Sequence, residues 1–322
     1  MTDRVVGPGL GAEATPRGGR DFIVEIAWLH HELGLTQDAI AVRMGVSRST
    51  ISRALTQAEA LGIVQVIVTE PPPESARLAD ALRQRFGIVA HVGLGSGGED
   101  PQAAAARAAA RLIERAVMSA GVVLAASWGR TLAKAASAVR PRRTSDVALV
   151  DAVGHASGGA LTPAVEVTSR LASALGAPTV HVPSPAFADS ASSLGFLLAS
   201  QPVRQALDLA RGADVTLVSV GLAGEVSLLR QAELMSAAAM ESAVKDGAVG
   251  EILGSYYDAA GRFVAVPGVF PVALTLEELR RSRRVVAVAA GAEKGPALAG
   301  ALAGRVVGEI VVDEALARAL LR

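Results

Sequence analysis

From residue 89 onward the chain alternates short apolar runs with longer helical segments, and this alternation constrains the fold more than any other feature. Strands that are apolar on both faces and joined by helices are typical of parallel sheets covered on both sides. The sequence therefore predicts the α/β class. Seven runs are predicted as buried strands: Val89–Leu94, Val122–Ala126, Val147–Val153, Thr179–Val182, Val215–Val220, Val285–Ala290 and Ile310–Val312. Three segments are predicted as crossover helices: Pro101–Ser119, Val165–Leu175 and Leu228–Val244.

Composition supports this class and excludes several kinds of chemistry. Aromatic residues make up only 3% of the chain, so its apolar mass is Ala, Val and Leu, which suits helices on a buried sheet better than a β-sandwich. The absence of cysteine excludes disulfides, thiolate catalysis and thiolate metal sites, and it favours a cytoplasmic location. No apolar stretch reaches membrane-spanning length, so no membrane partner is expected.

The first 70 residues follow a different, helical pattern. Apolar residues recur at helical spacing from Asp21 until Gly34, with Trp28 expected in the core, and two shorter helices follow. Thr36 is the predicted N-cap of the second helix, which carries Ala39, Ile40, Val42 and Met44 inward. Ser47 caps the third, which runs to Leu61. Small Ala41 at the crossing, Gly45 at the turn and Val46 in the core have the spacing of a helix-turn-helix.

The start of the third helix carries the residue types that contact DNA. In a helix-turn-helix the second helix of the pair lies in the major groove, where hydroxyl and guanidinium groups meet base edges and phosphates. Arg48 and Ser52 are predicted base or phosphate contacts, with Gln37 and Arg53 as backbone anchors. The full set of candidate DNA-binding residues is Gln37, Ser47, Arg48, Ser49, Thr50, Ser52 and Arg53.

The alternative is a module that only packs three helices together. Residues 21–70 hold three Arg against six acidic residues, and the whole chain has no net charge, so attraction to DNA is modest for one copy. Binding as a homo-oligomer, a dimer or a tetramer, is expected to compensate.

Pro71-Pro72-Pro73 marks the expected domain boundary, because proline neither extends a helix nor pairs in a central strand. Just before it, Ile63–Val68 is long enough for one strand, the wing of a winged helix-turn-helix. We therefore expect a disordered tail over 1–20, a DNA-binding domain over 21–70, and an effector-binding and oligomerisation domain over 71–322.

Four ordered motifs in the second part resemble those of the SorC/DeoR-type sugar-binding transcriptional regulators. They are Ser127-Trp128-Gly129-Arg130-Thr131-Leu132, the segment from Gly247 to Gly254, the loop from Ala289 to Lys294, and Val312-Asp313-Glu314-Ala315. The likeness extends from Phe22 onward, although Glu251 stands where this family usually has Asp. It implies a domain similar to phosphosugar isomerases but used to sense a phosphorylated sugar, in a dimeric or tetrameric repressor or activator that has no cofactor.

The effector site is expected where parallel strands end, because ligands of open α/β sheets bind beyond the carboxyl ends of the strands. Gly129 either permits a tight turn or lets backbone approach a phosphate, Arg130 and Thr131 bond the phosphate, and Lys294 supplies a charge. Glu251 or Asp246 accepts hydrogen bonds from sugar hydroxyls. The candidates are Ser127, Trp128, Gly129, Arg130, Thr131, Gly221, Asp246, Glu251 and Lys294, with Arg170 as a weaker one.

Other functions have less support. The five His residues lack metal-ligand spacing, and the loop Gly93–Gly98 lacks a dinucleotide fingerprint, so neither a metal nor a cofactor is expected. A phosphosugar isomerase or lyase, with Glu251 or Asp246 as general base, is the alternative function, and a plain oligomerisation protein is a third. The preferred hypothesis is a regulator of carbohydrate or polyol metabolism that binds a double-stranded DNA operator under the control of a small sugar, polyol or sugar phosphate.

Overall fold

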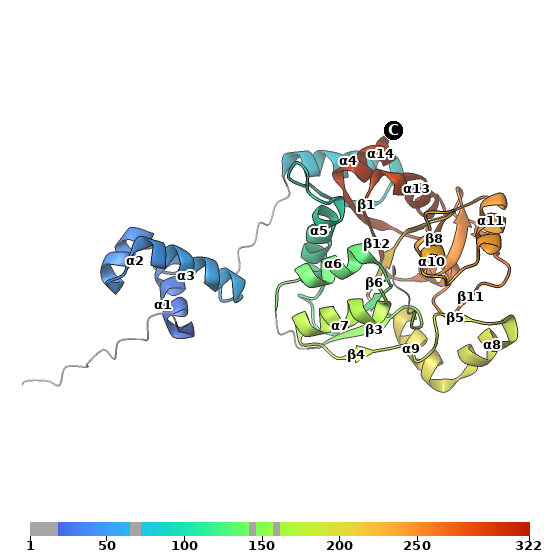
Figure 1. Cartoon of the computed structure of the whole chain (residues 1–322), viewed down its shortest axis with the longest axis horizontal. Coiled ribbons are helices and arrows are strands. Elements are labelled where there is room, and N and C mark those ends of the chain that lie inside the picture. The colour runs from blue at the N-terminus through green and yellow to red at the C-terminus, as the bar shows by residue number, and fades with distance from the viewer. Residues whose placement is uncertain (1–18, 65–71, 142–145, 157–161) are drawn as a thin grey trace, which may run out of the picture. The chain divides into compact units, whose positions relative to one another are not determined.

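The computed structural model describes residues 19–64, 72–141, 146–156 and 162–322 (Figure 1). The chain divides into two compact units, Met1–Glu70 and Pro71–Arg322, and each is described here by itself. Residues 1–18 of the predicted tail and residues 65–68 of the predicted strand lie outside the described residues. Gly19 and Arg20, expected in the tail, instead cap and begin the first helix.

The first unit contains a bundle of three helices, α1 (Arg20–His31), α2 (Gln37–Met44) and α3 (Arg48–Ala60). Each helix contributes one apolar stripe to a shared core, as the helical spacing of these residues predicts. The buried residues of this core are Phe22, Ile23, Ile26, Ala27, Leu29, Ile40, Ala41, Ile51, Ala54, Leu55 and Ala58.

Three side chains expected in this core lie outside it. Trp28 is 53% exposed and Val42 is 84% exposed, and Ala39 is exposed as well. A residue advances about 100° around a helix, so Trp28 falls on the opposite side of α1 from Phe22, Ile26 and Leu29. On the short helix α2, only Ile40 and Ala41 are buried. The predictions for Trp28 and Val42, which rested on hydrophobicity alone, therefore placed both side chains on the wrong side of their helices.

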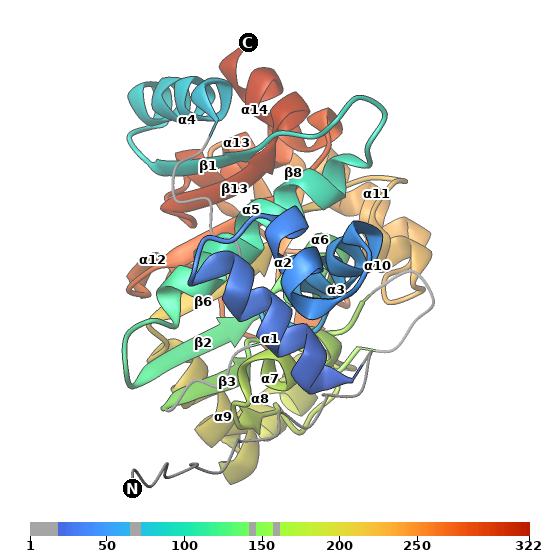
Figure 2. The same ribbon diagram turned by 90° about the vertical axis from the view of Figure 1, so that its left-hand side faces the viewer.

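A parallel sheet of seven strands forms the centre of the second unit. Its order is β1 (Val89–Gly93), β13 (Glu309–Asp313), β12 (Val285–Ala289), β6 (Val215–Ser219), β2 (Val122–Ala126), β3 (Val147–Asp151) and β4 (Thr179–Val180). Each of the seven predicted runs supplies one strand. Figure 2 shows β1 and β13 at one end of this sheet, with β2 and β3 toward the other. The α/β prediction is confirmed.

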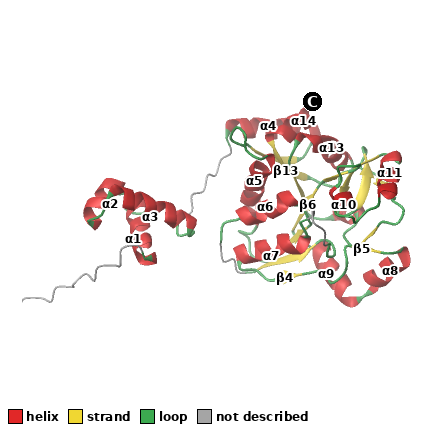
Figure 3. Cartoon of the chain, in the orientation of Figure 1, coloured by secondary structure: helices red, strands yellow, loops and turns green. Residues whose placement is uncertain are grey.

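Helices cover both faces of this sheet (Figure 3). Successive strand residues point to opposite faces, so Leu124 and Leu149 join one buried cluster while Ala125 and Val150 join the other. The first cluster packs under α5 (Pro101–Ala116), α6 (Arg130–Ala138) and α7 (Ala164–Leu175). The second includes residues of α4 (Pro73–Phe86), α9 (Gln201–Arg211), α12 (Leu276–Arg281), α13 (Gly295–Ala303) and α14 (Glu314–Leu321). Within the described ranges, no helix is long and apolar enough to span a bilayer.

Between β6 and β12 the chain builds elements that the sequence did not predict. An antiparallel sheet has the order β10 (Phe263–Val264), β9 (Ser255–Asp258), β8 (Ala248–Ile252) and β7 (Gly221–Leu222). The predicted helix Leu228–Val244 is in fact two helices, α10 (Leu228–Gln231) and α11 (Ala237–Lys245). Outside this stretch, α8 (Ala191–Ala199) precedes β6 and a short 3-10 helix (Ala292–Lys294) follows β12, and β5 (Phe187–Ala188) pairs with β11 (Phe270–Pro271).

Candidate functional site

The first candidate site is the turn between α2 and α3. Thr36 caps α2 by accepting the backbone N–H of Ala39, and Ser47 caps α3 by accepting that of Thr50, at 3.2 Å in both cases. Gly45 lies between them at φ +62°, a left-handed conformation that favours glycine. The two caps and the glycine fix the angle at which α3 leaves the turn.

A polar surface follows on α3. Ser47, Arg48, Ser49, Ser52 and Arg53 are exposed, whereas Thr50 and, on α2, Gln37 are half-buried. The Ser47 hydroxyl lies 2.8 Å from that of Ser49 and 2.9 Å from that of Thr50, so the three hydroxyls form one cluster at the helix N-terminus. Six of the seven predicted DNA-binding residues thus lie on the N-cap and first two turns of α3, and Gln37 begins α2.

The two arginines of this surface are held only weakly. Arg48 Nε lies 3.5 Å from Asp38 Oδ1, and both side chains are about 70% exposed, at 69% and 71%. Arg53 Nε donates to the backbone oxygen of Ser49 at 3.3 Å. A solvent-exposed ion pair contributes little free energy, so a phosphate group can replace Asp38 as the partner of Arg48 at small cost.

The second candidate site is a cavity of about 300 Å³ at the carboxyl edge of the parallel sheet. The strands that follow β2 in the chain lie on both sides of it in the sheet: β3 and β4 lie on one side, and β6, β12 and β13 lie on the other. Loops leaving the neighbouring strands β2 and β6 therefore diverge, which is where open α/β sheets bind ligands. The cavity is lined by Gln102, Trp128, Gly129, Arg130, Thr131, Ser219, Val220, Gly221, Leu222, Val226, Leu228, Gln231, Glu251, Glu293 and Lys294.

Seven of the nine predicted effector residues line this cavity, and Ser127 and Asp246 do not. Ser127 is fully buried, and its hydroxyl donates to the Trp128 carbonyl and accepts the Ser219 N–H, each at 2.9 Å. It therefore joins the ends of β2 and β6 beneath the cavity. Asp246 is exposed beyond the end of α11. Arg170, the weaker candidate, lies on α7 in an ion pair with Glu166.

Glycine is required at position 129 because the ends of β2 and β6 approach each other closely there. Its φ of +141° is disfavoured for any residue with a side chain, and an added Cβ would lie 2.0 Å from the Ser219 hydroxyl. Its N–H donates to the Thr162 carbonyl at 3.0 Å. Of the two roles considered for Gly129, the tight turn has direct structural support. The first-turn N–H groups of α6, which follow it, have no intrahelical acceptor.

Glu251 enters the cavity from a β-hairpin. β8 and β9 are joined by the two residues Leu253 and Gly254, both at positive φ, as the tightest hairpin turns require. The Gly254 N–H donates to Glu251 Oε2 at 2.9 Å. On the paired strand β7, any Cβ at Gly221 would lie 2.2 Å from Glu251 Oε1, so glycine makes room for the carboxyl group.

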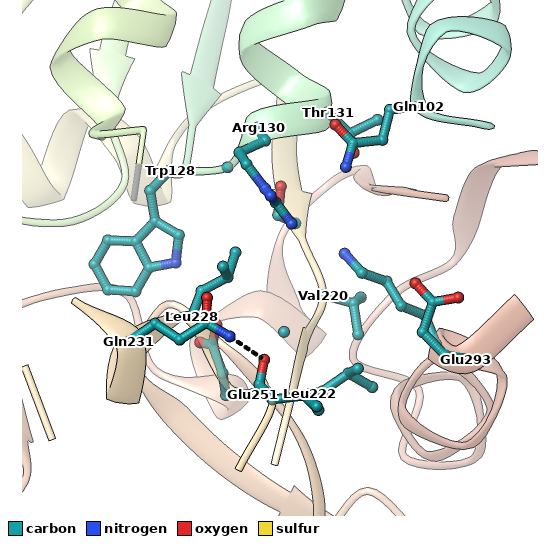
Figure 4. Close-up of a pocket in the computed structure, with 15 residues that line it drawn as sticks. Gln102, Trp128, Arg130, Thr131, Val220, Leu222, Leu228, Gln231, Glu251 and Glu293 are labelled. Atoms are coloured by element: carbon teal, nitrogen blue, oxygen red, sulfur yellow. Dashed lines mark hydrogen bonds between the residues drawn. The ribbon is translucent and has the colours of Figure 1, made fainter. Parts of the chain in front are cut away.

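The charges of the cavity are strongly affected by burial. Burial raises the pKa of Glu251 to about 7, even though the Gly254 N–H and the Lys294 charge act in the opposite direction. Burial also lowers the pKa of Lys294, against the attraction of Glu251 and Glu293. Figure 4 shows Arg130, Thr131 and Gln102 across the cavity from Glu251 and Leu222. The cavity therefore offers cations for an anionic group and a carboxyl group for hydroxyls.

Sequence reasoning missed several lining residues. Gln102 is the second residue of α5, after the N-cap Asp100, and nothing in its helical segment marked it as part of a strand-end site. Leu228 and Gln231 come from α10, which the sequence did not separate from α11. Ser219 ends β6 inside an apolar run, and its buried hydroxyl oxygen has no hydrogen-bond partner among the described residues. A polar residue at the end of a buried strand was the available signal for Ser219.

Comparison with known proteins finds a matching family model for each part of the chain. Residues 70–322 match the family model of a sugar-binding domain, Sugar-bind, and residues 26–78 match a MarR family model. The erythritol catabolism regulatory protein EryD of Brucella abortus is 29% identical over 300 residues, covering 92% of this chain and 94% of EryD. The deoxyribonucleoside regulator of Bacillus subtilis is 26% identical over 313 residues, covering 95% of this chain and 98% of that regulator.

A solved structure agrees with these relatives. The full-length sorbitol operon regulator SorC from Klebsiella pneumoniae superposes with a TM-score of 0.77 at 26% identity, over 94% of this chain and 98% of SorC. The similarity therefore includes both the helix-turn-helix and the sheet that holds the cavity.

Proposed function

Because the chain belongs to the SorC/DeoR-type family of sugar-binding transcriptional regulators, we propose that it binds an operator through α3 and that a small effector in the cavity controls this binding. The observation that carries the proposal is the exposed hydroxyl and guanidinium surface at the start of α3, from Ser47 to Arg53. This polar surface serves no core, and it has the chemistry that bases and phosphates require.

Selection of bound fragments from genomic DNA tests the first half of the proposal. The chain should enrich a defined sequence, and the variant Arg48→Ala/Arg53→Ala should lose at least about tenfold in affinity for it, since each arginine contact contributes on the order of 1 kcal/mol or more. Arg77→Ala, which removes an equally exposed arginine from α4, is the matched control and should bind like the parent. Equal affinity of the double variant and the parent would remove the DNA-binding role from α3.

For the effector we propose a small polyhydroxy compound, a sugar or polyol, and in particular one that bears a phosphate. Arg130, Lys294 and the first turn of α6 suit the anionic group, and Glu251, Gln102 and Gln231 suit the hydroxyls. The relatives named for erythritol catabolism and the sorbitol operon support this class of compound.

Thermal unfolding with a panel of sugars, polyols and their phosphates tests the effector class. A compound that binds only the folded chain raises its stability by mass action, by about 2.7 kcal/mol at 100 times the Kd. Lys294→Ala should abolish the shift caused by a phosphorylated compound, whereas Lys245→Ala on α11 should keep it. A panel without any shift would contradict the sensing role and leave the DNA-binding test unaffected.

We also propose that the cavity binds its effector without converting it, which fits the naming of the relatives as regulators. Full recovery of unchanged ligand after prolonged incubation is the expected result, and an isomerised or cleaved product would favour an enzyme. The proposal further includes a homo-oligomer, dimer or tetramer, acting in the cytoplasm where an operator is accessible.

A further inference from the structure

The exposed side of α5 carries charges of one sign only. α5 packs beside α6 on one face of the parallel sheet and turns its Ala, Leu and Ile residues inward (Figure 1). All of α5 is among the described residues, and after Pro101, which begins it, the exposed ones are Arg107, Arg111 and Arg115. We call these three residues the arginine row. Their spacing of four places them within about 80° of the helix circumference, over about 12 Å along its axis.

The arginine row has few counter-charges within the protein. Arg107 binds both carboxylate oxygens of Glu99, whereas Arg111 and Arg115 form no ion pair among the described residues. Like charges four residues apart on a helix repel each other and destabilise it. Exposed helix sides ordinarily mix acidic and basic residues, so a side with arginine alone needs an explanation.

A fourth arginine adds to this positive charge. Arg140 follows α6, and its Nε donates to Glu114 at 3.0 Å, so the one acidic residue of α5 is already paired. Burial lowers the pKa of Arg111, and the charges of Arg115 and Arg107 lower it further. An anion placed against the arginine row would relieve this repulsion.

Double-stranded DNA is the anion that suits a row of this kind. A duplex carries one negative charge per about 1.7 Å of its axis, so a row about 12 Å long faces several phosphates. A guanidinium group binds a phosphate through two N–H donors at once. The first unit needs additional cations, because residues 21–70 hold three Arg against six acidic residues.

We propose that the arginine row binds phosphates of the DNA that the chain holds through α3. This inference rests on the proposed operator binding and extends it, because the contact comes from the effector-binding unit and is independent of base sequence. The same helix also reaches the effector cavity, which Gln102 lines at the start of α5. One rigid element thus carries residues for both ligands.

The salt dependence of DNA affinity tests the proposal. Affinity is measured at increasing salt for the operator fragment from the genomic selection and for a scrambled fragment of equal length. Each phosphate contact contributes about 0.9 to the slope of log affinity against log salt concentration. Arg111→Gln/Arg115→Gln should therefore flatten the slope by about 1.8 for each copy bound. At low salt this variant should bind both fragments more weakly by the same factor, at least about tenfold.

Two further variants separate this contact from other effects of charge. Arg111→Lys/Arg115→Lys keeps both charges and should retain the slope of the parent. Arg77→Gln/Arg83→Gln removes the same number of charges from α4, where the two side chains are 80% and 60% exposed, and should retain the slope as well. The melting temperature of Arg111→Gln/Arg115→Gln should be no lower than that of the parent, since the substitution removes a repulsion.

The possible outcomes distinguish this proposal from operator binding by α3. An unchanged slope for Arg111→Gln/Arg115→Gln, with operator binding that still depends on Arg48 and Arg53, would overturn the role of the arginine row alone. Equal flattening by the α4 variant would overturn it too, because net charge would then explain the effect. A lower mass in analytical ultracentrifugation without a change in slope would overturn it in favour of a contact between copies of the chain. A parent chain that binds no DNA would overturn both proposals.

Discussion

At the scale of single residues, the buried carboxyl of Glu251 carries a cost in stability at the position where we propose that it binds the effector. Its pKa is about 7 in the folded chain against 4.5 as the ordinary value, because the cavity disfavours the charged form. The folded state therefore holds a proton that the unfolded state has released between these two values. Stability decreases as the pH rises through this window and is lowest above pH 7.

Glu251→Gln should therefore stabilise the chain at pH 8 by up to about 3 kcal/mol, because it removes the cost of a buried charge. At pH 5 the difference should be small, since the folded parent is then protonated. Chemical denaturation measures the free energy of unfolding at both pH values. Glu241→Gln, which changes an exposed residue of α11, is the control and should change the free energy of unfolding at neither pH. A gain of equal size at both pH values would contradict the assigned pKa.

Gly129 gives a second prediction at this scale. Gly129→Ala forces a Cβ against Ser219 at a backbone conformation that alanine rarely adopts, so it should destabilise the chain by about 2–4 kcal/mol. Gly195→Ala, on α8 with open space around it, is the matched control. Thermal unfolding compares the two, and equal melting temperatures would mean that the strand ends separate easily.

Single residues also show where sequence reasoning succeeds. Lys294 was predictable because it follows the predicted strand Val285–Ala290, and Glu251 because the segment from Gly247 to Gly254 resembles a motif of the family. The prediction for Trp28 was wrong, because it followed the hydrophobicity of the side chain. The angular position of Trp28 on the helix relative to Ile26 and Leu29 indicates an exposed side chain, as the structure shows.

At the scale of elements, the N-cap of α3 links folding to function. Ser47→Ala removes the hydroxyl that accepts the Thr50 N–H and should destabilise the first unit by about 1 kcal/mol. Ser52→Ala, exposed on the same helix, should leave stability unchanged. Far-ultraviolet circular dichroism during thermal unfolding measures both changes, and equal behaviour of the two variants would mean that the cap does not hold the helix.

Elements differ in how well the sequence predicts them. The seven parallel strands were found because each lies in a longer apolar run of the sequence; β12 and β13 are buried at every position, whereas the edge strand β4 is not buried. β5, β7, β10 and β11 are two residues long, which is too short for any period to appear. The break between α10 and α11 was not predicted, because apolar residues continue through it. These residues, Ala232, Leu234 and Met235, all pack inward.

At the scale of the whole molecule, each ligand should act mainly on the unit that binds it. A sugar phosphate should shift the unfolding transition of residues 71–322 more than that of the first unit, and operator DNA should do the reverse. Differential scanning calorimetry of the full chain with each ligand measures this. A ligand that shifts both transitions equally would instead reveal strong coupling between the units.

The division into two units was predictable, since the triple proline Pro71-Pro72-Pro73 begins at the boundary between them. The full lining of the cavity was not, because it combines residues from the start of α5, the ends of β2 and β6, and the β8–β9 hairpin. These segments lie far apart in the sequence, and only the strand order brings them together.

That strand order has a consequence for how such a chain can change over evolutionary time. Arg130 and Gln102 come from the stretch before β3, and Gly221, Glu251 and Lys294 come from the stretch after β6. A single genetic crossover between residues 152 and 214 therefore yields a hybrid whose cavity takes one wall from each parent. Homologous recombination between relatives can therefore exchange the two walls of the cavity separately, while the helix-turn-helix is inherited intact from one parent.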